Sequence, residues 1–234
     1  MLLEKIGVVR SCYGEKFGVP RQPGLCPSAW GVLIFDEPYR SEEALRGIEE
    51  FSHLWIVFHF HQTADQGWHP TVRPPRLGGN RRVGVFASRS PFRPNPLGLS
   101  VVRLEGIERN RPDGPVLRLG GVDLVDGTLV FDVKPYVPYT DALPDANGGY
   151  AVGEPPRVRV VVEESAAQVF SALPERARRV IEESLALDAR PAPHDDPERV
   201  YGVGMCGNNV RFRMDGEVCR VVGIESSQGS GLYI

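Results

Sequence analysis

Residues 100–133 read SVVRLEGIERNRPDGPVLRLGGVDLVDGTLVFDV and contain three short apolar runs, at 100–104, 116–119 and 128–133. Each run is rich in Val and Leu and is bounded by Gly, Pro, Asn or Asp, which is typical of β-strands separated by turns. Asp126-Gly127 lies between the second and third runs. It predicts a hairpin there, because both residue types tolerate the positive φ angles of a tight turn.

The same pattern continues toward the N-terminus, with further β-branched or aromatic runs at 5–10, 30–35, 54–60 and 82–86. One helix is expected over 41–50, since Ser41 can cap it and the next two residues, both Glu, suit the positive end of the helix dipole. Many short strands with a single helix indicate a mainly β fold, a closed or nearly closed barrel. The strand–helix alternation of a Rossmann fold is missing.

The chain changes character after residue 137. Residues 138–156 hold four prolines and three glycines among polar residues, which predicts either a linker, at 146–157, or a long functional loop. Beyond it we expect a strand at 158–162, helices at 165–173 and 174–187, and a hairpin of 210–214 with 218–222 around Asp215-Gly216. The apolar face of the helices would consist of Val169, Leu173, Ala177, Val180, Ile181 and Leu185. The expected organisation is a barrel domain over 1–145 and a small α+β domain over 158–234.

The charge distribution is uneven along the chain. The 234 residues carry a net charge of −3, which argues against a protein that coats nucleic acid. Residues 66–104, however, contain no Asp or Glu and hold seven arginines: Arg73, Arg76, Arg81, Arg82, Arg89, Arg93 and Arg103. Because guanidinium groups suit bidentate contacts with anions, this segment predicts a local site for an anionic ligand such as phosphate. The alternative is a solvated loop whose arginines cluster by chance.

Composition and motifs exclude several classes of protein. No run approaches 18 apolar residues and no signal-peptide pattern is present, so we expect no membrane association. The four cysteines lack a Cys-x-x-Cys pair, which predicts free thiols in a cytoplasmic protein. Residues 202–207 match the G-x-G-x-x-G pattern of dinucleotide-binding folds, but a hairpin follows them where that site needs a helix.

The histidines at 53–61 do not favour a metal site. His59 and His61 are two residues apart and share one face of a strand, and His53 lies nearby. No carboxylate follows them until Asp65. We expect instead that one histidine packs in the core and another lines a ligand pocket, with no metal bound.

Two polar segments hold the residues best suited to chemistry. Residues 88–100, SRSPFRPNPLGLS, contain three prolines that restrict the backbone and can hold Arg89, Arg93 and Asn95 in place before a ligand arrives. Residues 132–141, DVKPYVPYTD, bring together two carboxylates, an ammonium and two phenols, which could supply proton acceptors and orienting hydrogen bonds. A rigid surface loop and a polar strand end are the alternatives.

These segments closely resemble the TrmO family, also called TsaA- or YaeB-like, of S-adenosylmethionine-dependent tRNA methyltransferases. Two further pieces agree: Gln22-Pro23-Gly24-Leu25, and FSHLW at 51–55 leading into His61-Gln62. The four pieces occur in the family order over roughly residues 5–145. The tail, with LDARP at 187–191, resembles the C-terminal domain of the bacterial members.

The resemblance implies a β-barrel methyltransferase domain followed by a small domain that aids tRNA binding. It implies a homodimer that uses S-adenosylmethionine to methylate the exocyclic amine of N6-threonylcarbamoyladenosine, 3′ to the anticodon of certain tRNAs. The cofactor contacts carried over from the family are Gln22, Pro23, Gly24, His61, Gln62, Arg89, Leu99, Asp132, Val133, Lys134 and Pro135.

Residue chemistry suggests the remaining roles. Methyl transfer from a sulfonium needs mainly alignment, but the conjugated acceptor amine becomes a better nucleophile as its proton leaves. The candidate proton acceptors are Asp141, Tyr139 and then Asp132. Lys134 would orient a carboxylate or hold the cofactor, and Arg93, on the same fixed loop as Asn95, would pair with the threonyl carboxylate.

Two other functions stay open on the residues alone. A barrel with a cationic loop could bind RNA or a nucleotide-derived ligand without any chemistry. A methyltransferase with a different acceptor would use the same cofactor site. Only the family resemblance favours the tRNA reaction over these two.

Overall fold

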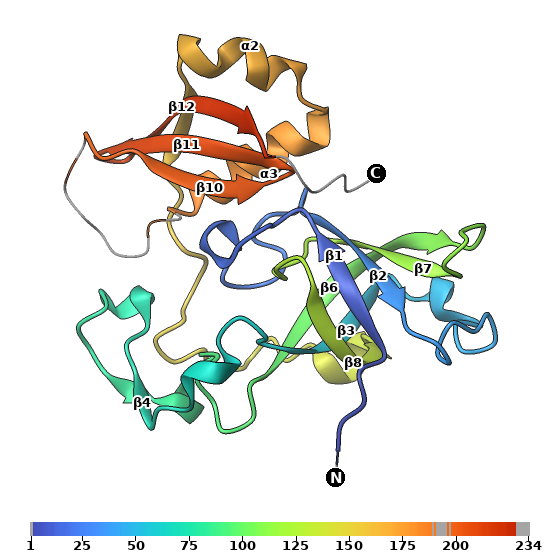
Figure 1. The fold of residues 1–234 in the computed structure, drawn as a ribbon. Helices are drawn as coiled ribbons and strands as arrows, with labels where there is room; N and C mark the ends of the chain where they lie inside the picture. The colour runs from blue at the N-terminus through green and yellow to red at the C-terminus, as the bar shows by residue number, and fades with distance from the viewer. Residues whose placement is uncertain (1, 189, 191–195, 197, 228–234) are drawn as a thin grey trace.

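The computed structural model describes residues 2–188, 190, 196 and 198–227, and its described part is mainly β, as the sequence predicts (Figure 1). Six antiparallel strands form a closed barrel in the order β1-β2-β7-β6-β3-β8. Their bounds are β1 Gly7–Ser11, β2 Trp30–Phe35, β3 His53–His59, β6 Leu97–Glu108, β7 Val116–Gly120 and β8 Thr128–Pro135. Short 3-10 turns lie between them: η1 Lys16–Gly18, η2 Ile48–Glu50, η3 Ala64–Gln66, η4 Pro75–Leu77 and η5 Val85–Ala87.

Side-chain alternation explains why these strands close into a barrel. In β3, Leu54, Ile56 and Phe58 are buried while the residues between them are partly exposed. Strand β3 pairs with β6 along one edge and with β8 along the other. The apolar face of each strand therefore points into a common core, and no edge of β3 is left unpaired.

Two expectations about the barrel region are wrong. The run at 82–86 contributes only β5 Val83–Gly84, which pairs with β4 Thr71–Val72 outside the barrel. Asp126-Gly127 makes a turn, with Gly127 at φ 80°, but not a hairpin between consecutive strands. Strand β8 pairs with β1 and β3, and β7 pairs with β2 and β6. The chain therefore crosses the end of the barrel at this turn.

The helix expected over 41–50 does not form. Ser41, Glu42 and Glu43 begin a series of tight turns, in which Ala44 N–H donates to Ser41 O at 3.1 Å and Leu45 N–H to Glu42 O at 3.2 Å. Gly47 then adopts φ 82°, a left-handed conformation that an α-helix cannot contain. The segment therefore ends in the 3-10 turn η2 and not in a regular helix.

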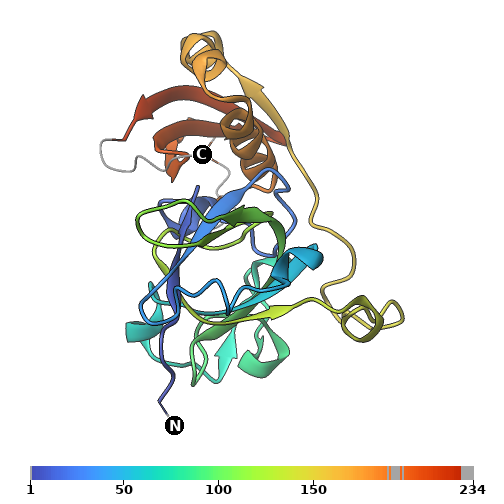
Figure 2. The same ribbon diagram turned by 90° about the vertical axis from the view of Figure 1, so that its right-hand side faces the viewer.

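The C-terminal region is an α+β unit, as expected. A sheet in the order β10-β11-β12-β9 is covered by two helices, and it lies above the barrel in Figures 1 and 2. The elements are β9 Arg159–Val162, α2 Glu164–Ala172, α3 Glu175–Ala186, β10 Tyr201–Met205, β11 Asn208–Asp215 and β12 Val218–Ser226. Strand β10 was not expected, because Gly202 and Gly204 interrupt its apolar pattern. One residue of the predicted apolar helix face is exposed to solvent: Val169 is 43% exposed. In α2 the buried residue is Ala166.

Backbone contacts join the barrel to the C-terminal sheet. The chain just after β1 forms a bridge between Tyr13 and Met205 of β10, and Gly14 N–H donates to Gly204 O at 3.1 Å. Tyr13 is fully buried, and its hydroxyl lies 3.0 Å from Ser184 Oγ of α3. One continuous core of buried side chains includes residues of both sheets.

Some sequence features lie at the limits of the described chain. Ala189, Pro191 and Pro197 of the tail lie outside the described residues.

All four cysteines are free thiols: Cys12, Cys26 and Cys219 are buried and Cys206 is partly buried. Within the described ranges, no helix has the length and apolarity needed to cross a membrane.

Packing inside the barrel gives a first prediction. Gly98 of β6 lies opposite Phe58 of β3, and a Cβ at this position would overlap the Phe58 ring. Gly98→Ala should lower the free energy of unfolding by about 1–3 kcal/mol, the usual cost of overpacking a core. Gly84→Ala is the matched control, because a Cβ there meets nothing within 4 Å. Urea unfolding measures both variants, and equal midpoints would show that the Phe58 ring moves aside without cost.

Candidate functional site

The outward face of β3 forms the floor of a pocket on the side of the barrel. His53 and Trp55 alternate with the buried residues of β3, so their side chains point outward. Trp55 pairs with Val101 of β6 on one side and with Lys134 of β8 on the other. Tyr136 N–H continues this ladder by donating to His53 O at 3.0 Å. The floor is therefore built on three hydrogen-bonded strands, which makes it rigid.

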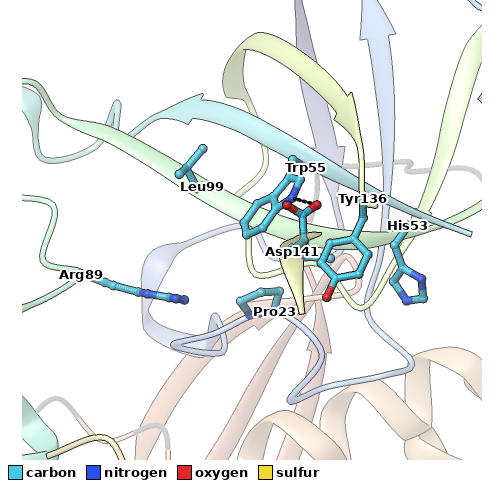
Figure 3. Close-up of a pocket in the computed structure, with 8 residues that line it drawn as sticks. Pro23, His53, Trp55, Arg89, Leu99, Tyr136 and Asp141 are labelled. Atoms are coloured by element: carbon cyan, nitrogen blue, oxygen red, sulfur yellow. Dashed lines mark hydrogen bonds between the residues drawn. The ribbon is translucent and has the colours of Figure 1, made fainter. Parts of the chain in front are cut away.

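The pocket has a volume of about 440 Å³ and draws its walls from five segments of the chain. It is lined by Pro23, His53, Trp55, Arg89, Leu99, Val101, Tyr136 and Asp141 (Figure 3). Leu99 is 59% exposed, so the pocket opens to solvent on the side of β6. Aromatic and apolar walls with a few polar groups, at this volume, are typical of small-molecule sites.

Asp141 joins the segment after β8 to the pocket floor. Trp55 Nε1–H and Val137 N–H both donate to Asp141 Oδ2, each at 2.9 Å. These bonds fix the short helix α1 Pro138–Asp141 against β3. The hydrogen bond from the Val137 backbone, and next the one from Trp55, lower the pKa of Asp141. Its carboxylate is therefore ionised at neutral pH and is a weak proton acceptor, with Oδ1 left for an incoming donor.

Arg89 stands across the pocket from Asp141, on the proline-rich loop (Figure 3). Its Nη1 donates to Gln22 Oε1, which ties this loop to the loop of residues 20–29. Arg93 holds the proline-rich loop from within, since its Nη1 donates to Ser88 O at 2.7 Å and to Val85 O at 3.1 Å. The loop thus presents the exposed Arg89 cation from a fixed backbone, as its three prolines suggest.

A carboxyl group that the sequence did not single out lies close to Arg89. Asp123, in the turn after β7, accepts a hydrogen bond from the buried Ser100 Oγ of β6. Burial raises the pKa of Asp123 to about 6, although the Ser100 hydrogen bond and the Arg89 charge act in the opposite direction. The charge on Asp123 therefore changes close to neutral pH, within electrostatic reach of Arg89.

The structure brings four of the predicted site residues together. Pro23, Arg89, Leu99 and Asp141 line the pocket, and Gln22 reaches it through Arg89. These residues come from three of the four pieces that resemble the TrmO family.

Seven other predicted cofactor residues do not line the pocket: Gly24, His61, Gln62, Asp132, Val133, Lys134 and Pro135. Lys134 Nζ and Asp132 Oδ2 form an ion pair at 2.7 Å. Val133 and Pro135 pair with β3 through their backbones. His61 follows the far end of β3, and partial burial lowers its pKa.

Four predicted catalytic residues lie apart from the pocket lining: Lys134, which is paired with Asp132, and Tyr139, Arg93 and Asn95. Tyr139 is 91% exposed on α1. Arg93 Nη1 donates hydrogen bonds to two backbone carbonyls. The Arg93 guanidinium lies over the Phe86 ring, 5.7 Å from the ring centroid. Asn95 is exposed, and its backbone carbonyl accepts a hydrogen bond from Leu97 N–H at 2.7 Å. Arg93 and Asn95 therefore shape the loop that carries Arg89.

Four lining residues are not among the predicted site residues: His53, Trp55, Val101 and Tyr136. A usable signal was present in β3, where alternation around the apolar Leu54, Ile56 and Phe58 places His53 and Trp55 on one outward face. Val101 and Tyr136 needed the strand register, which puts β6 and β8 on either side of β3.

Metal-ligand geometry is absent from the part of the chain that the structure describes. No three His, Cys, Asp or Glu side chains there are grouped so that they could hold an ion. His59, one of the candidates, has a buried Nδ1 without a hydrogen-bond partner among the described residues and packs against Phe131, 6.1 Å between ring centroids.

Comparison with known proteins gives consistent matches over both halves of the chain. The family model of the tRNA-methyltransferase O N-terminal domain matches residues 8–142, and that of the TrmO C-terminal domain matches residues 155–227. A relative from Escherichia coli K12, named tRNA (adenine(37)-N6)-methyltransferase, is 50% identical over 90% of this chain and 92% of its own length. A Pyrococcus abyssi relative, named "Probable S-adenosyl-L-methionine-binding protein", is 40% identical over 62% of this chain and 73% of its own.

A solved structure agrees with these matches. The crystal structure of TrmO from Pseudomonas aeruginosa superimposes with a TM-score of 0.79 at 39% sequence identity, and the match covers 97% of this chain and 98% of that one. The likeness therefore includes the barrel and the C-terminal region together.

The contact between Asp141 and Trp55 gives a prediction about pH. Since the pKa of Asp141 is lowered in the folded state, its ionised carboxylate stabilises the fold above the pKa of an unfolded aspartate, about 3.9. The difference in unfolding free energy between wild type and Asp141→Asn should be largest above this pH. It should vanish as the pH falls through the lower folded pKa. Denaturant unfolding at a series of pH values measures the difference, and a pH-independent difference would contradict the assignment.

Proposed function

Because the chain belongs to the tRNA-methyltransferase O family, we propose that it is an S-adenosylmethionine-dependent methyltransferase acting on N6-threonylcarbamoyladenosine next to the anticodon of tRNA. The observation that carries the proposal is the pocket on the barrel, where Arg89 and Leu99 of one family-like segment face Asp141 of the other. The barrel and its relatives indicate a methyltransferase built without a Rossmann sheet.

The volume and the lining of the pocket support a site for S-adenosylmethionine. Trp55, Leu99 and Val101 offer aromatic and apolar surface to an adenine ring, and Arg89 offers fixed donors to a carboxylate. When bound, the cofactor supplies a methyl group already activated by its sulfonium. Of the family-implied contacts, Pro23, Arg89 and Leu99 would hold it directly, and Gln22 would act through its hydrogen bond with Arg89. Residues 24, 61–62 and 132–135 do not line the pocket. They would affect cofactor binding indirectly, through the backbone and through their charges.

The acceptor amine would be oriented mainly by Asp141. Both of its hydrogen bonds fall on Oδ2, so Oδ1 can accept a hydrogen bond from the substrate N–H. Its lowered pKa favours orientation over full proton removal. Tyr139, on the same short helix, and Asp132, paired with Lys134, stay as the other candidate proton acceptors.

Arg93 is the proposed partner of the threonyl carboxylate. Its Nη1 is occupied by Val85 O and Ser88 O, but these bonds leave the other nitrogens of the guanidinium for a bidentate contact. Asn95, two residues away and exposed, is the neighbouring donor on the same loop. Such contacts would make methylation depend on prior threonylcarbamoylation.

The tRNA would dock on the arginine-rich segment that projects from the barrel around β4 and β5. Four of its arginines, Arg73, Arg76, Arg81 and Arg82, are exposed. Trp68 is 53% exposed on the same segment and could stack on a base. Cations for phosphates beside an aromatic for bases are the features of an RNA-binding surface.

The proposed organisation of the chain is two domains joined by a linker. We divide the chain into a barrel domain over 1–145, a linker over 146–157 and a C-terminal α+β domain over 158–234 that assists tRNA binding. The enzyme would act as a homodimer in the cytoplasm, where tRNA is modified. The exposed apolar side chains of Leu99, Tyr139 and Leu143 beside the open pocket suit contact with a second copy.

Mass spectrometry of tRNA nucleosides tests the reaction. Incubation of the protein and tRNA with isotope-labelled cofactor should add one labelled methyl group to threonylcarbamoyladenosine, without added metal. The same tRNA lacking the threonylcarbamoyl group should give at most a small fraction of that product. Equal methylation of unmodified adenosine would contradict the assigned substrate. Cofactor binding with no methylated nucleoside would favour a non-catalytic binding protein.

Separate sites for cofactor and tRNA predict opposite effects of two arginine substitutions. Replacing both Arg81 and Arg82 by Ala should weaken tRNA binding and lower the salt slope by about 0.7–0.9 for each phosphate that is no longer neutralised. Cofactor affinity should stay unchanged. Arg89→Ala should weaken cofactor binding by about tenfold or more, because it removes a charged hydrogen bond of roughly 1.5–3 kcal/mol.

Binding titrations at several salt concentrations measure these effects. An unchanged salt slope in the double variant would remove the arginine-rich segment as the RNA surface. The C-terminal strands, with Arg211 and Arg213 on β11, would then be the next candidate surface.

A further inference from the structure

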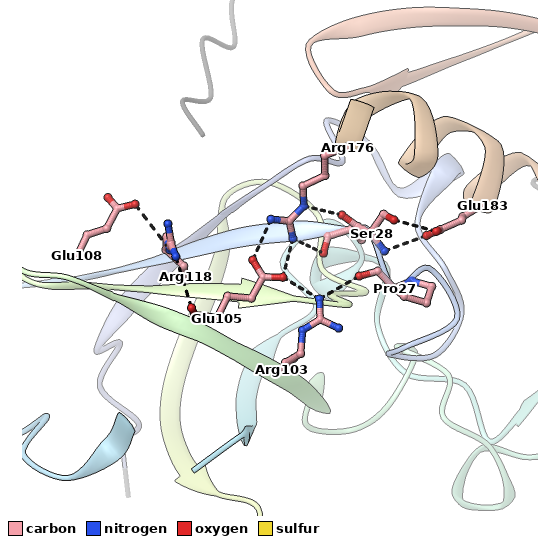
Figure 4. A network of polar contacts seen from close by, with 9 residues as sticks. Pro27, Ser28, Arg103, Glu105, Glu108, Arg118, Arg176 and Glu183 are labelled. Atoms are coloured by element: carbon pink, nitrogen blue, oxygen red, sulfur yellow. Dashed lines mark hydrogen bonds and ion pairs between the residues drawn. The ribbon is translucent and has the colours of Figure 1, made fainter. Parts of the chain in front are cut away.

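The C-terminal helix α3 holds the loop that carries Gln22 and Pro23 into the pocket. Glu183 of α3 accepts hydrogen bonds from Ser28 N–H at 2.9 Å and from Ser28 Oγ at 2.8 Å (Figure 4). The buried Cys26 thiol donates to the same carboxylate at 3.2 Å. Burial raises the pKa of Cys26 to about 12, so this thiol stays protonated and can donate. One carboxylate on α3 therefore gathers three donors from the loop of residues 20–29.

Arg176, two turns earlier on α3, holds the same loop through its carbonyl groups. Its Nε donates to Ser28 O at 2.9 Å, and its two terminal nitrogens donate to the two oxygens of Glu105, each at 2.8 Å (Figure 4). The guanidinium also lies over the Trp30 ring, 5.5 Å from its centroid. Arg176 therefore links α3, the loop and the barrel strand β6.

Glu105 completes the network from the barrel side. It accepts a further hydrogen bond, at 2.7 Å, from Arg103, which in turn donates to Pro27 O at 3.3 Å. Burial alone would raise the pKa of Glu105, but the hydrogen bonds from Arg176 and then Arg103 outweigh it and lower the pKa. The carboxylate is thus ionised at neutral pH. Arg103 shares the outward face of β6 with the pocket residues Leu99 and Val101.

The network leads to the pocket through a short stretch of chain. Cys26 follows Pro23 closely in the sequence, and Gly24 N–H between them donates to Gly121 O at 2.9 Å. Gln22, before Pro23, accepts the hydrogen bond from Arg89. The loop is therefore fixed by α3 at one end and contacts the cofactor pocket at the other.

We propose that Glu183 and Arg176 are positioning residues for the cofactor site. They hold residues 26–28 so that Pro23 and Gln22 are in place before the ligand binds, and Gln22 in turn orients Arg89. A loop ordered in advance does not lose conformational freedom on binding, so the affinity is higher. The C-terminal region thereby acts on the cofactor site as well as on RNA. This inference rests on the proposed function, in which the pocket binds S-adenosylmethionine.

Glu183→Gln tests the proposal, with Glu182→Gln as the matched control. Both substitutions remove one negative charge from the same turn of α3, but Glu182 is exposed to solvent. Glu183→Gln should raise the Kd and KM for S-adenosylmethionine about tenfold, equivalent to about 1.4 kcal/mol. The kcat at saturating cofactor should stay within about twofold, because Asp141 and the β3 floor are untouched. Glu182→Gln should change neither.

A merely structural role gives a different result. If the network only attaches α3 to the barrel, Glu183→Gln lowers the melting temperature and the amount of active enzyme, while the Kd of the folded fraction stays at the wild-type value. That outcome overturns the proposal. Ser28→Ala, which removes one donor and no charge, is the second variant in case Glu183→Gln does not fold, and it should raise the Kd a few-fold. Combined with Glu183→Gln, it should add less than its separate effect.

Hydrogen exchange provides a readout that needs no cofactor. The Gly24 amide, protected by Gly121 O, should exchange faster in Glu183→Gln than in wild type or Glu182→Gln. Unchanged exchange at Gly24 would overturn the proposal even if the wild-type protein bound no S-adenosylmethionine. Failure of wild-type binding would instead contradict the proposed function, so the two failures are distinct.

Discussion

Pairing of β3 on both of its edges is the constraint on which the rest of the structure depends. Because β6 and β8 flank β3, the inner side chains of β3 complete the barrel core while its outer ones form the pocket floor. A one-residue slip of β3 would exchange Leu54 and Ile56 with His53 and Trp55, burying the site and exposing the core. The same strand pairing that closes the barrel therefore also forms the pocket floor.

The walls of the pocket are loops, and each is held by contacts outside the pocket. Asp141 is fixed by Trp55 and by the backbone of Val137. The proline-rich loop is fixed by Arg93, and the loop of residues 20–29 by Glu183 of the C-terminal helix. A rigid floor with independently anchored walls suits methyl transfer, in which alignment of two bound groups accounts for most of the catalysis.

The sequence predicts most of the strands but not their pairing. The run at 30–35 coincides with β2, because β-branched and aromatic residues there are bounded by clear turn residues. Local patterns failed at glycines: Gly47 adopts a positive φ within the helix expected over 41–50, and Gly202 and Gly204 interrupt the apolar pattern of β10. The sequence predicts the turn at Asp126-Gly127. The strands before and after it, β7 and β8, do not pair with each other, because their partners are set by long-range barrel closure.

The site was predictable only in part, for a similar reason. Arg89 and Asp141 stand out as charged residues in rigid segments, and both line the pocket. Trp55 carries no charge, and although the alternation in β3 puts it on the outward face, only the closed sheet places it in the pocket floor. The anchoring of the loop by Glu183 joins residues 155 positions apart along the chain, which no local pattern can indicate.

Nuclear magnetic resonance of the indole N–H groups, during titration with S-adenosylhomocysteine, tests most directly whether this pocket is the cofactor site. The protein has three tryptophans: Trp30 in the core, Trp55 in the pocket floor and Trp68 exposed on the arginine-rich segment. We expect a saturable shift of the Trp55 Nε1–H resonance, with that of Trp68 unchanged. Saturable binding that leaves the Trp55 resonance in place would contradict it.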